Sequence, residues 1–107
     1  MAQTKIAQLQ LLQQNLQGVL AQKQQLESEL IELESALKEA STSPQTYKII
    51  GKIMVLAPKA GILKELEEKK TNIILKITSF TKQEDKIKEN LESLQQEVLF
   101  EMKSKNG

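Results

Sequence analysis

The side chains that usually carry out catalysis are almost absent from this sequence. It has no His, no Cys and no Arg, and Asp85 is its one aspartate. Catalytic triads and most metal sites are therefore excluded, because they require histidine, thiolate or clustered carboxylate groups. The glutamates could supply a carboxylate pair, but they alternate with lysines and no predicted pocket would raise a pKa. We predict no enzyme activity, no cofactor and no metal ion.

The chemistry that remains is that of apolar surfaces, and both ends of the chain carry more apolar residues than one helix interface needs. Near the C-terminus, Leu99 and Phe100 follow Val98 directly, so the three cannot all enter one interface. Exposed apolar groups bind other apolar chains. The candidate contacts for such a client chain are Ile6, Leu9, Leu12, Val98, Leu99, Phe100 and Met102. Frayed helix ends, or packing against a neighbouring subunit's end, is an alternative that the residues alone leave open.

Heptad periodicity predicts the elements that hold these residues. Apolar residues three and four positions apart are typical of a coiled-coil helix, and we call its a and d positions the seam. In the first arm the seam is Leu9, Leu12, Leu16, Val19, Lys23, Leu26, Leu30, Leu33, Leu37 and Ala40. In the second arm it is Leu63, Leu66, Lys70, Ile73, Ile77, Phe80, Glu84, Ile87, Leu91, Leu94, Val98 and Glu101. We predict a mainly α chain, one domain over 1–107, with helices over 3–41 and 58–104.

Two charged residues interrupt the seam on opposite arms, Lys23 and Glu84. Counted from the connection between the helices they fall at similar heights, so they could pair and fix the register. Alternatively, both side chains could extend out to water from the edge of the seam.

The segment between the helices changes its period. Pro44 cannot continue the first helix. Residues 46–56 are rich in β-branched and apolar side chains, and Gly51-Lys52 at their centre fits a two-residue type II′ turn. The predicted hairpin makes the two helices antiparallel, so both termini should lie at the end away from it.

Both faces of this hairpin are apolar. One carries Tyr47, Ile49, Met54 and Leu56; the other carries Lys48, Ile50, Ile53 and Val55. A lone hairpin is marginal in water, and its open edges favour pairing with other strands. We therefore predict an oligomerisation site made of Tyr47, Ile49, Ile50, Gly51, Ile53, Met54, Val55 and Leu56. In the alternative, the hairpin folds onto its own helices and one of its faces stays partly exposed to solvent.

The charge balance argues against nucleic acid as a partner, and the short apolar runs argue against a membrane. There are 15 basic and 14 acidic side chains, and they are interleaved along both arms. Nucleic-acid binding normally requires a gathered basic excess. No apolar run approaches the roughly 20 residues of a membrane span. We predict a soluble, cytoplasmic protein.

Several stretches of the sequence together resemble the β-type subunit of archaeal prefoldin. The resemblance covers nearly the whole chain in the order helix, one hairpin, helix. The stretches that carry it are Ile6–Gln14, Val19–Glu27, Tyr47-Lys48 with the Gly51 turn, and Ile62–Leu66. This chain departs from the usual pattern by having Gly51-Lys52 where Gly-Asn is common, and by a short Ser/Thr/Pro connection in place of an acidic linker.

The resemblance implies a chaperone that works without ATP. In that family two α-type and four β-type subunits form a hexamer, whose hairpins assemble into a β-barrel body and whose coiled coils hang from it. The free ends of the coiled coils hold non-native polypeptides and deliver them to a group II chaperonin. A different hypothesis remains beside it: a coiled-coil spacer or adaptor whose hairpin docks one specific folded partner.

Overall fold

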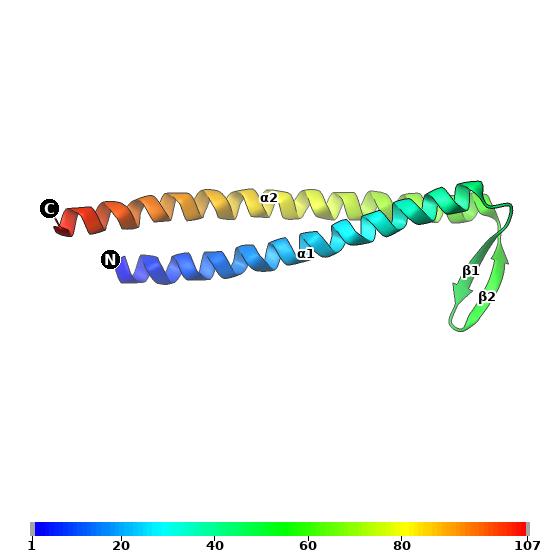
Figure 1. Cartoon of the computed structure of the whole chain (residues 1–107), viewed down its shortest axis with the longest axis horizontal. Coiled ribbons are helices and arrows are strands. Elements are labelled where there is room, and N and C mark those ends of the chain that lie inside the picture. Colours follow the sequence, from blue (N-terminus) through cyan, green and yellow to red (C-terminus); the bar gives the residue numbers. More distant parts are fainter. Residues whose placement is uncertain (1, 107) are drawn as a thin grey trace. The chain divides into compact units, whose positions relative to one another are not determined.

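A computed structural model of the chain describes residues 2–106. Its elements are α1 (Ala2–Thr42), β1 (Thr46–Ile50), β2 (Ile53–Ala57) and α2 (Lys59–Asn106), in that order (Figure 1). These limits lie within a few residues of the ranges expected from the sequence. Among residues 2–106, no helix has an apolar stretch long enough to cross a membrane.

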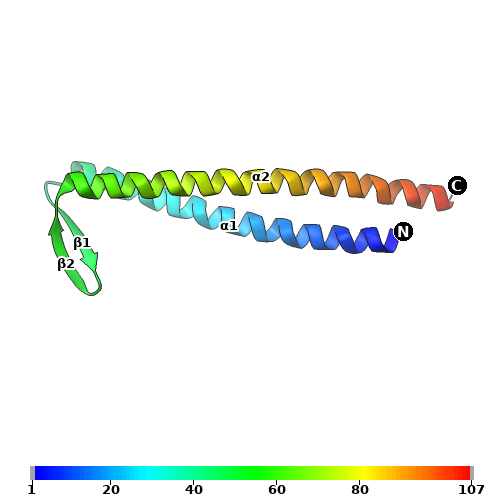
Figure 2. The same cartoon turned by 180° about the vertical axis from the view of Figure 1, so that it is seen from behind.

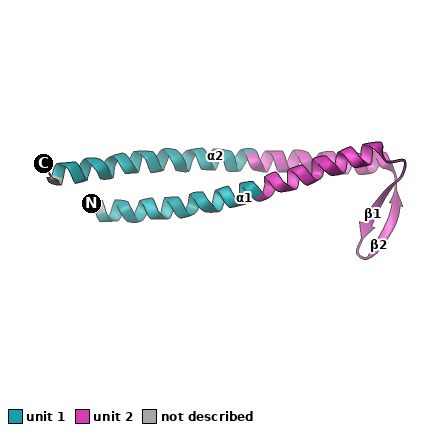
Figure 3. Cartoon of the chain, viewed as in Figure 1, with its two compact units in different colours: residues 1–24, 78–107 teal, residues 25–77 magenta. Residues whose placement is uncertain are grey.

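The residues group into two compact units (Figure 3). Unit 1 contains Met1–Gln24 and Thr78–Gly107, and unit 2 contains Gln25–Ile77. Each helix therefore contributes to both units, while the hairpin belongs to unit 2 alone. The expectation of a single domain stays a prediction.

Within each unit the helices pack through the predicted seam. In α1 every seam residue is partly buried and the residues between them are exposed; Lys5, which precedes the seam, is also partly buried. In α2 the most buried seam residues are Glu84, Leu91 and Val98. Figures 1 and 2 show the helices of unit 1 side by side and running in opposite directions. The predicted antiparallel two-helix coiled coil is confirmed.

Hydroxyl groups close the C-terminal end of α1. Ser41 Oγ donates to the carbonyl of Lys38, and Ser43 Oγ donates to the carbonyl of Glu39, both at 2.8 Å. Lys59 Nζ donates to the carbonyl of Ser41 at 2.6 Å. Because the last carbonyls of a helix have no partner within it, these polar side chains favour an end to α1 at this point.

The hairpin has the register and turn that its sequence predicts. Tyr47 pairs with Leu56, and Ile50 pairs with Ile53 next to the turn. Gly51 has a φ of +62°, and no other described residue has a positive φ. A type II′ turn requires a positive φ only at its first central residue, whereas type I′ requires it at both.

One side-chain interaction closes the open end of the hairpin, and another links the hairpin to α2. At its open end, Thr46 is buried and its Oγ1 donates to the carbonyl of Ala57 at 2.8 Å. On one face, Lys48 Nζ lies 3.3 Å from Glu65 Oε2 near the start of α2. The hairpin thus contacts α2 through the ion pair of Lys48 and Glu65, while its turn extends away from the helices (Figure 1).

Two glycines should respond in opposite ways to substitution by alanine. A Cβ at Gly18 or at Gly51 would meet no atom within 4 Å, so only backbone conformation matters. Gly18→Ala, inside α1, should stabilise the chain by about 1 kcal/mol. Gly51→Ala should destabilise the hairpin by about 1–2 kcal/mol, because its φ lies in the left-handed region. Urea unfolding of both variants checks the pair, and a stabilising Gly51→Ala would contradict the turn assignment.

Candidate functional site

The apolar side chains of the hairpin are exposed on both of its faces. This hairpin surface consists of Tyr47, Ile49, Ile50, Ile53, Met54, Val55 and Leu56, whose exposed fractions run from 42% to 70%. Apolar side chains clustered at such exposure are typical of an interface. The predicted oligomerisation site itself stays a prediction.

The hairpin does not lie flat on its own helices. A groove of about 590 Å³ separates them, with Tyr47 and Met54 on the hairpin side and Ile62 and Leu66 on the side of α2. The structure therefore differs from the alternative in which the helices of the same chain bury one face of the hairpin. Both faces are left for other contacts.

The ends of the helices in unit 1 carry a second exposed apolar surface. We call it the end surface, and it consists of Ile6, Leu99, Phe100 and Met102. Phe100 is 73% exposed, the largest value among the exposed large apolar side chains. Leu99 and Phe100 lie between the seam residues Val98 and Glu101, on the side of α2 that faces away from α1.

Three of the predicted client contacts are seam residues and do not belong to the end surface. Leu9 and Leu12 are partly buried, and Val98 is 7% exposed. A residue that closes the helix interface cannot reach a client unless the interface opens. Val98 is therefore removed from the candidate set, and the exposed neighbours Leu99 and Phe100 are its main members.

A charged cluster beside the end surface was not anticipated from the sequence. Lys5 Nζ lies 2.5 Å from Glu101 Oε1 and 3.4 Å from Glu97 Oε2. The hydrogen bond to Glu101, assisted by the charges of both glutamates, raises the pKa of Lys5. Extending the heptad register one repeat toward the N-terminus would have placed Lys5 at a d position, opposite the d residue Glu101.

The predicted pair between the two charged seam residues is confirmed. Lys23 Nζ donates to Glu84 Oε1 at 2.9 Å, and Lys88 Nζ donates to Glu84 Oε2 at 2.7 Å. Glu84 is buried, and each of its carboxylate oxygens accepts from a lysine. A buried carboxylate needs such partners. Lys23 of α1 therefore supplies a partner that Glu84 requires in the seam.

Unit 1 should lose stability in acid through Glu84. The hydrogen bond from Lys88, together with that from Lys23, holds the pKa of this carboxyl below its usual range. Such a group stabilises the fold fully above its unfolded-state pKa of about 4.3, and less as pH falls through the folded-state value. The midpoint of thermal unfolding should therefore fall more steeply below about pH 4.3 in the parent chain than in Glu84→Gln. Circular dichroism melts across acidic pH measure both slopes, and equal slopes would count against the pair.

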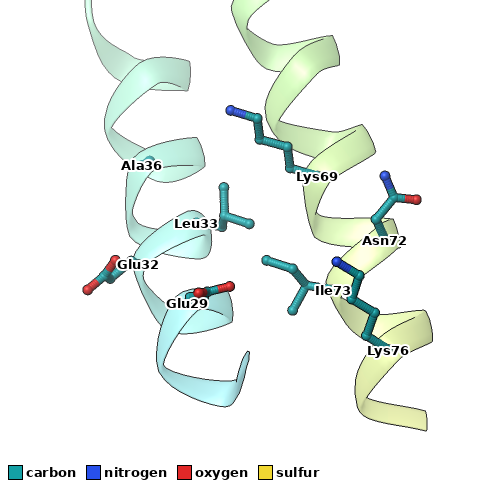
Figure 4. Close-up of a pocket in the computed structure, with 8 residues that line it drawn as sticks. All are labelled: Glu29, Glu32, Leu33, Ala36, Lys69, Asn72, Ile73 and Lys76. Atoms are coloured by element: carbon teal, nitrogen blue, oxygen red, sulfur yellow. The ribbon is translucent and has the colours of Figure 1, made fainter. Parts of the chain in front are cut away.

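Charged side chains of both helices border the apolar contact in unit 2. In unit 2, Glu29 of α1 and Lys76 of α2 line the same groove, and Leu33 and Ile73 point toward each other between the helices (Figure 4). Among the described residues, no group of three or more acidic side chains is placed to hold a metal ion. The arrangement is that of a coiled-coil flank, with an apolar contact bordered by charges.

Known proteins share both the sequence and the arrangement of this chain. A family model described as a prefoldin subunit matches residues 3–104. The chain belongs to the prefoldin family. Prefoldin subunit beta of Archaeoglobus fulgidus is 38% identical over 99 residues, which cover 90% of this chain and 85% of that protein. For prefoldin subunit beta of Methanothrix thermoacetophila the identity is 37%, with 90% and 82% covered.

A solved structure agrees with these sequence matches. The crystal structure of the prefoldin beta subunit from Thermococcus strain KS-1 matches with a TM-score of 0.87 at 33% identity, covering 91% of this chain and 88% of that one. Membership of the prefoldin family supports a chaperone-type function and assembly with other prefoldin subunits. The family consists of chaperone subunits and is not known for enzymes.

Proposed function

We propose that this prefoldin chain is a subunit of an ATP-independent holdase, which binds non-native polypeptides at its end surface and passes them to a group II chaperonin. The observation that carries the proposal is the exposure of Leu99, Phe100 and Met102 at the end of α2, outside the seam. An unfolded chain exposes apolar side chains, and burying them against this surface is favourable for both partners.

The chemistry of the end surface suits a changing set of clients. Apolar burial has no fixed direction, so it does not require one client sequence. Phe100 offers a large contact area, and the unbranched side chain of Met102 adapts to differently shaped groups. Binding of this kind is reversible and needs no nucleotide. Hand-over then depends on a chaperonin that binds the same client more favourably.

The hairpin surface would carry out assembly in this proposal. Two α-type and four β-type subunits would join their hairpins into a β-barrel, which buries both apolar faces and pairs the open strand edges. The hairpin surface is exposed and a groove separates it from the helices of unit 2, so both faces remain accessible for this assembly. The complex would act in the cytoplasm, where newly made chains require protection.

Aggregation of a denatured test protein provides the experiment. The test protein is diluted from denaturant into buffer, and light scattering is followed with this chain assembled together with an α-type subunit. Suppression that is the same with and without ATP supports the proposal. The adaptor hypothesis predicts unchanged scattering and tight binding to one native protein, and that result would overturn the holdase function.

A further inference from the structure

A second candidate surface lies on the flank of unit 1, close to the end surface. It is a groove of about 370 Å³, within the range of roughly 300–1,000 Å³ found for ligand sites. Leu11 and Leu12 of α1 and Leu94 of α2 supply its apolar lining, and Leu11 is exposed. The groove extends to Glu97, one helical turn before Phe100, so it adjoins the end surface.

The polar lining of this groove can form hydrogen bonds that the chain itself does not use. Gln8 of α1 and Asn90 and Ser93 of α2 border it, and all three are exposed. Within the described part of the chain, none of these three side chains is hydrogen-bonded. Amide and hydroxyl side chains both donate and accept. The groove therefore combines an apolar lining with unused donors and acceptors on both helices.

The charge of the groove narrows the choice of occupant. Its one charged residue is Glu97, at the end of the groove that adjoins the end surface, where Glu97 Oε2 lies 3.4 Å from Lys5 Nζ. A neutral, hydrogen-bonding border complements the neutral N–H and C=O groups of a polypeptide backbone. In a helix these groups already bond to one another, whereas in an extended non-native segment they are free.

We propose that this groove binds an extended segment of non-native polypeptide through its backbone. Apolar side chains of the segment pack on Leu11, Leu12 and Leu94, and its N–H and C=O groups bond to Gln8, Asn90 and Ser93. The inference rests on the proposed function and adds a second element of recognition. Because every polypeptide has the same backbone, these hydrogen bonds discriminate unfolded from folded segments without selecting a sequence.

The experiment uses a short fluorescent peptide of alternating Leu and Ser, and the same peptide with N-methylated backbone amides. Methylation removes backbone donors and keeps the side chains. Fluorescence anisotropy with the full, assembled chain should show binding about tenfold weaker for the methylated peptide. The Asn90→Ala/Ser93→Ala variant, in which only Gln8 of the three remains, should discriminate less between the two peptides. Leu11→Ser should weaken binding of both.

Gln14→Ala is the matched control, because Gln14 is an exposed amide on α1 outside the groove. It should keep the preference for the unmethylated peptide. Equal binding of the two peptides to the parent chain would overturn the groove assignment, even where the complex still suppresses aggregation. Unchanged binding of both peptides in Leu11→Ser would also overturn it. The scattering experiment with the parent complex tests the proposed function separately.

Discussion

Replacing Leu99 and Phe100 together with serine is expected to remove most of the protection that the assembled complex gives to a denatured protein. Both side chains are exposed, so their loss should leave the seam and the fold intact. An apolar side chain buried against a client contributes about 1.5–3 kcal/mol, and a factor of ten in affinity corresponds to about 1.4 kcal/mol. At least about tenfold more complex should be needed for equal suppression of light scattering.

A matched control separates the end surface from general surface hydrophobicity. Ile31 and Leu75 are similarly exposed large apolar residues, but they lie in unit 2. The Ile31→Ser/Leu75→Ser variant should protect as well as the parent chain. Equal loss in both double variants would show that overall hydrophobicity, rather than the end surface, binds the client.

Charging the hairpin surface is expected to prevent assembly. Ile50 and Ile53 pair across the strands next to the turn, and both are exposed in the single chain. In the Ile50→Asp/Ile53→Asp variant, two apolar contributions of about 1.5–3 kcal/mol each are lost and carboxylates would be buried without partners. Association should weaken by at least about a hundredfold. Size-exclusion chromatography with light scattering gives the mass, and circular dichroism should show unchanged helices.

Lys52→Ala tests whether charge at the turn alone decides assembly. Lys52 is exposed between the strands and contributes no apolar area. This variant should assemble like the parent chain. A hexamer that persists in the Ile50→Asp/Ile53→Asp variant would contradict the assignment of assembly to the hairpin surface.

The seam and the hairpin could be predicted because each follows from local periodicity. A residue's place in a heptad determines whether it faces the partner helix, and the pairs around a two-residue turn are determined by the turn. Thus Leu33 and Ile73 meet, and Tyr47 lies opposite Leu56. Predicting the pair of Lys23 and Glu84 required one more step, in which residues were counted along both helices from the connection between them.

The end of the helix pair was predicted less well, because buried and exposed apolar residues follow one another directly there. The sequence identifies Val98, Leu99 and Phe100 as a surplus, but the packing of α1 against α2 decides that Val98 is buried and its neighbours exposed. The contact of Lys5 with Glu101 was not predicted, because the heptad register was assigned only from Leu9 onward. The groove beside Leu11 depends on side chains from both helices at one height, which periodicity in one helix does not indicate.

The seam has a consequence for how the chain unfolds. Leu91 and Val98 are the only buried apolar residues in the described part of the chain, and the rest of the seam is partly exposed. Each turn of a helix is therefore stabilised mainly by the turn opposite to it, so that stability accumulates along the length as in a zipper. Such a chain opens turn by turn from its ends, and hydrogen exchange should decrease in a gradient along each helix. Deleting one heptad from each helix, at positions that face each other, would shorten the coiled coil and leave the hairpin surface and the end surface unchanged.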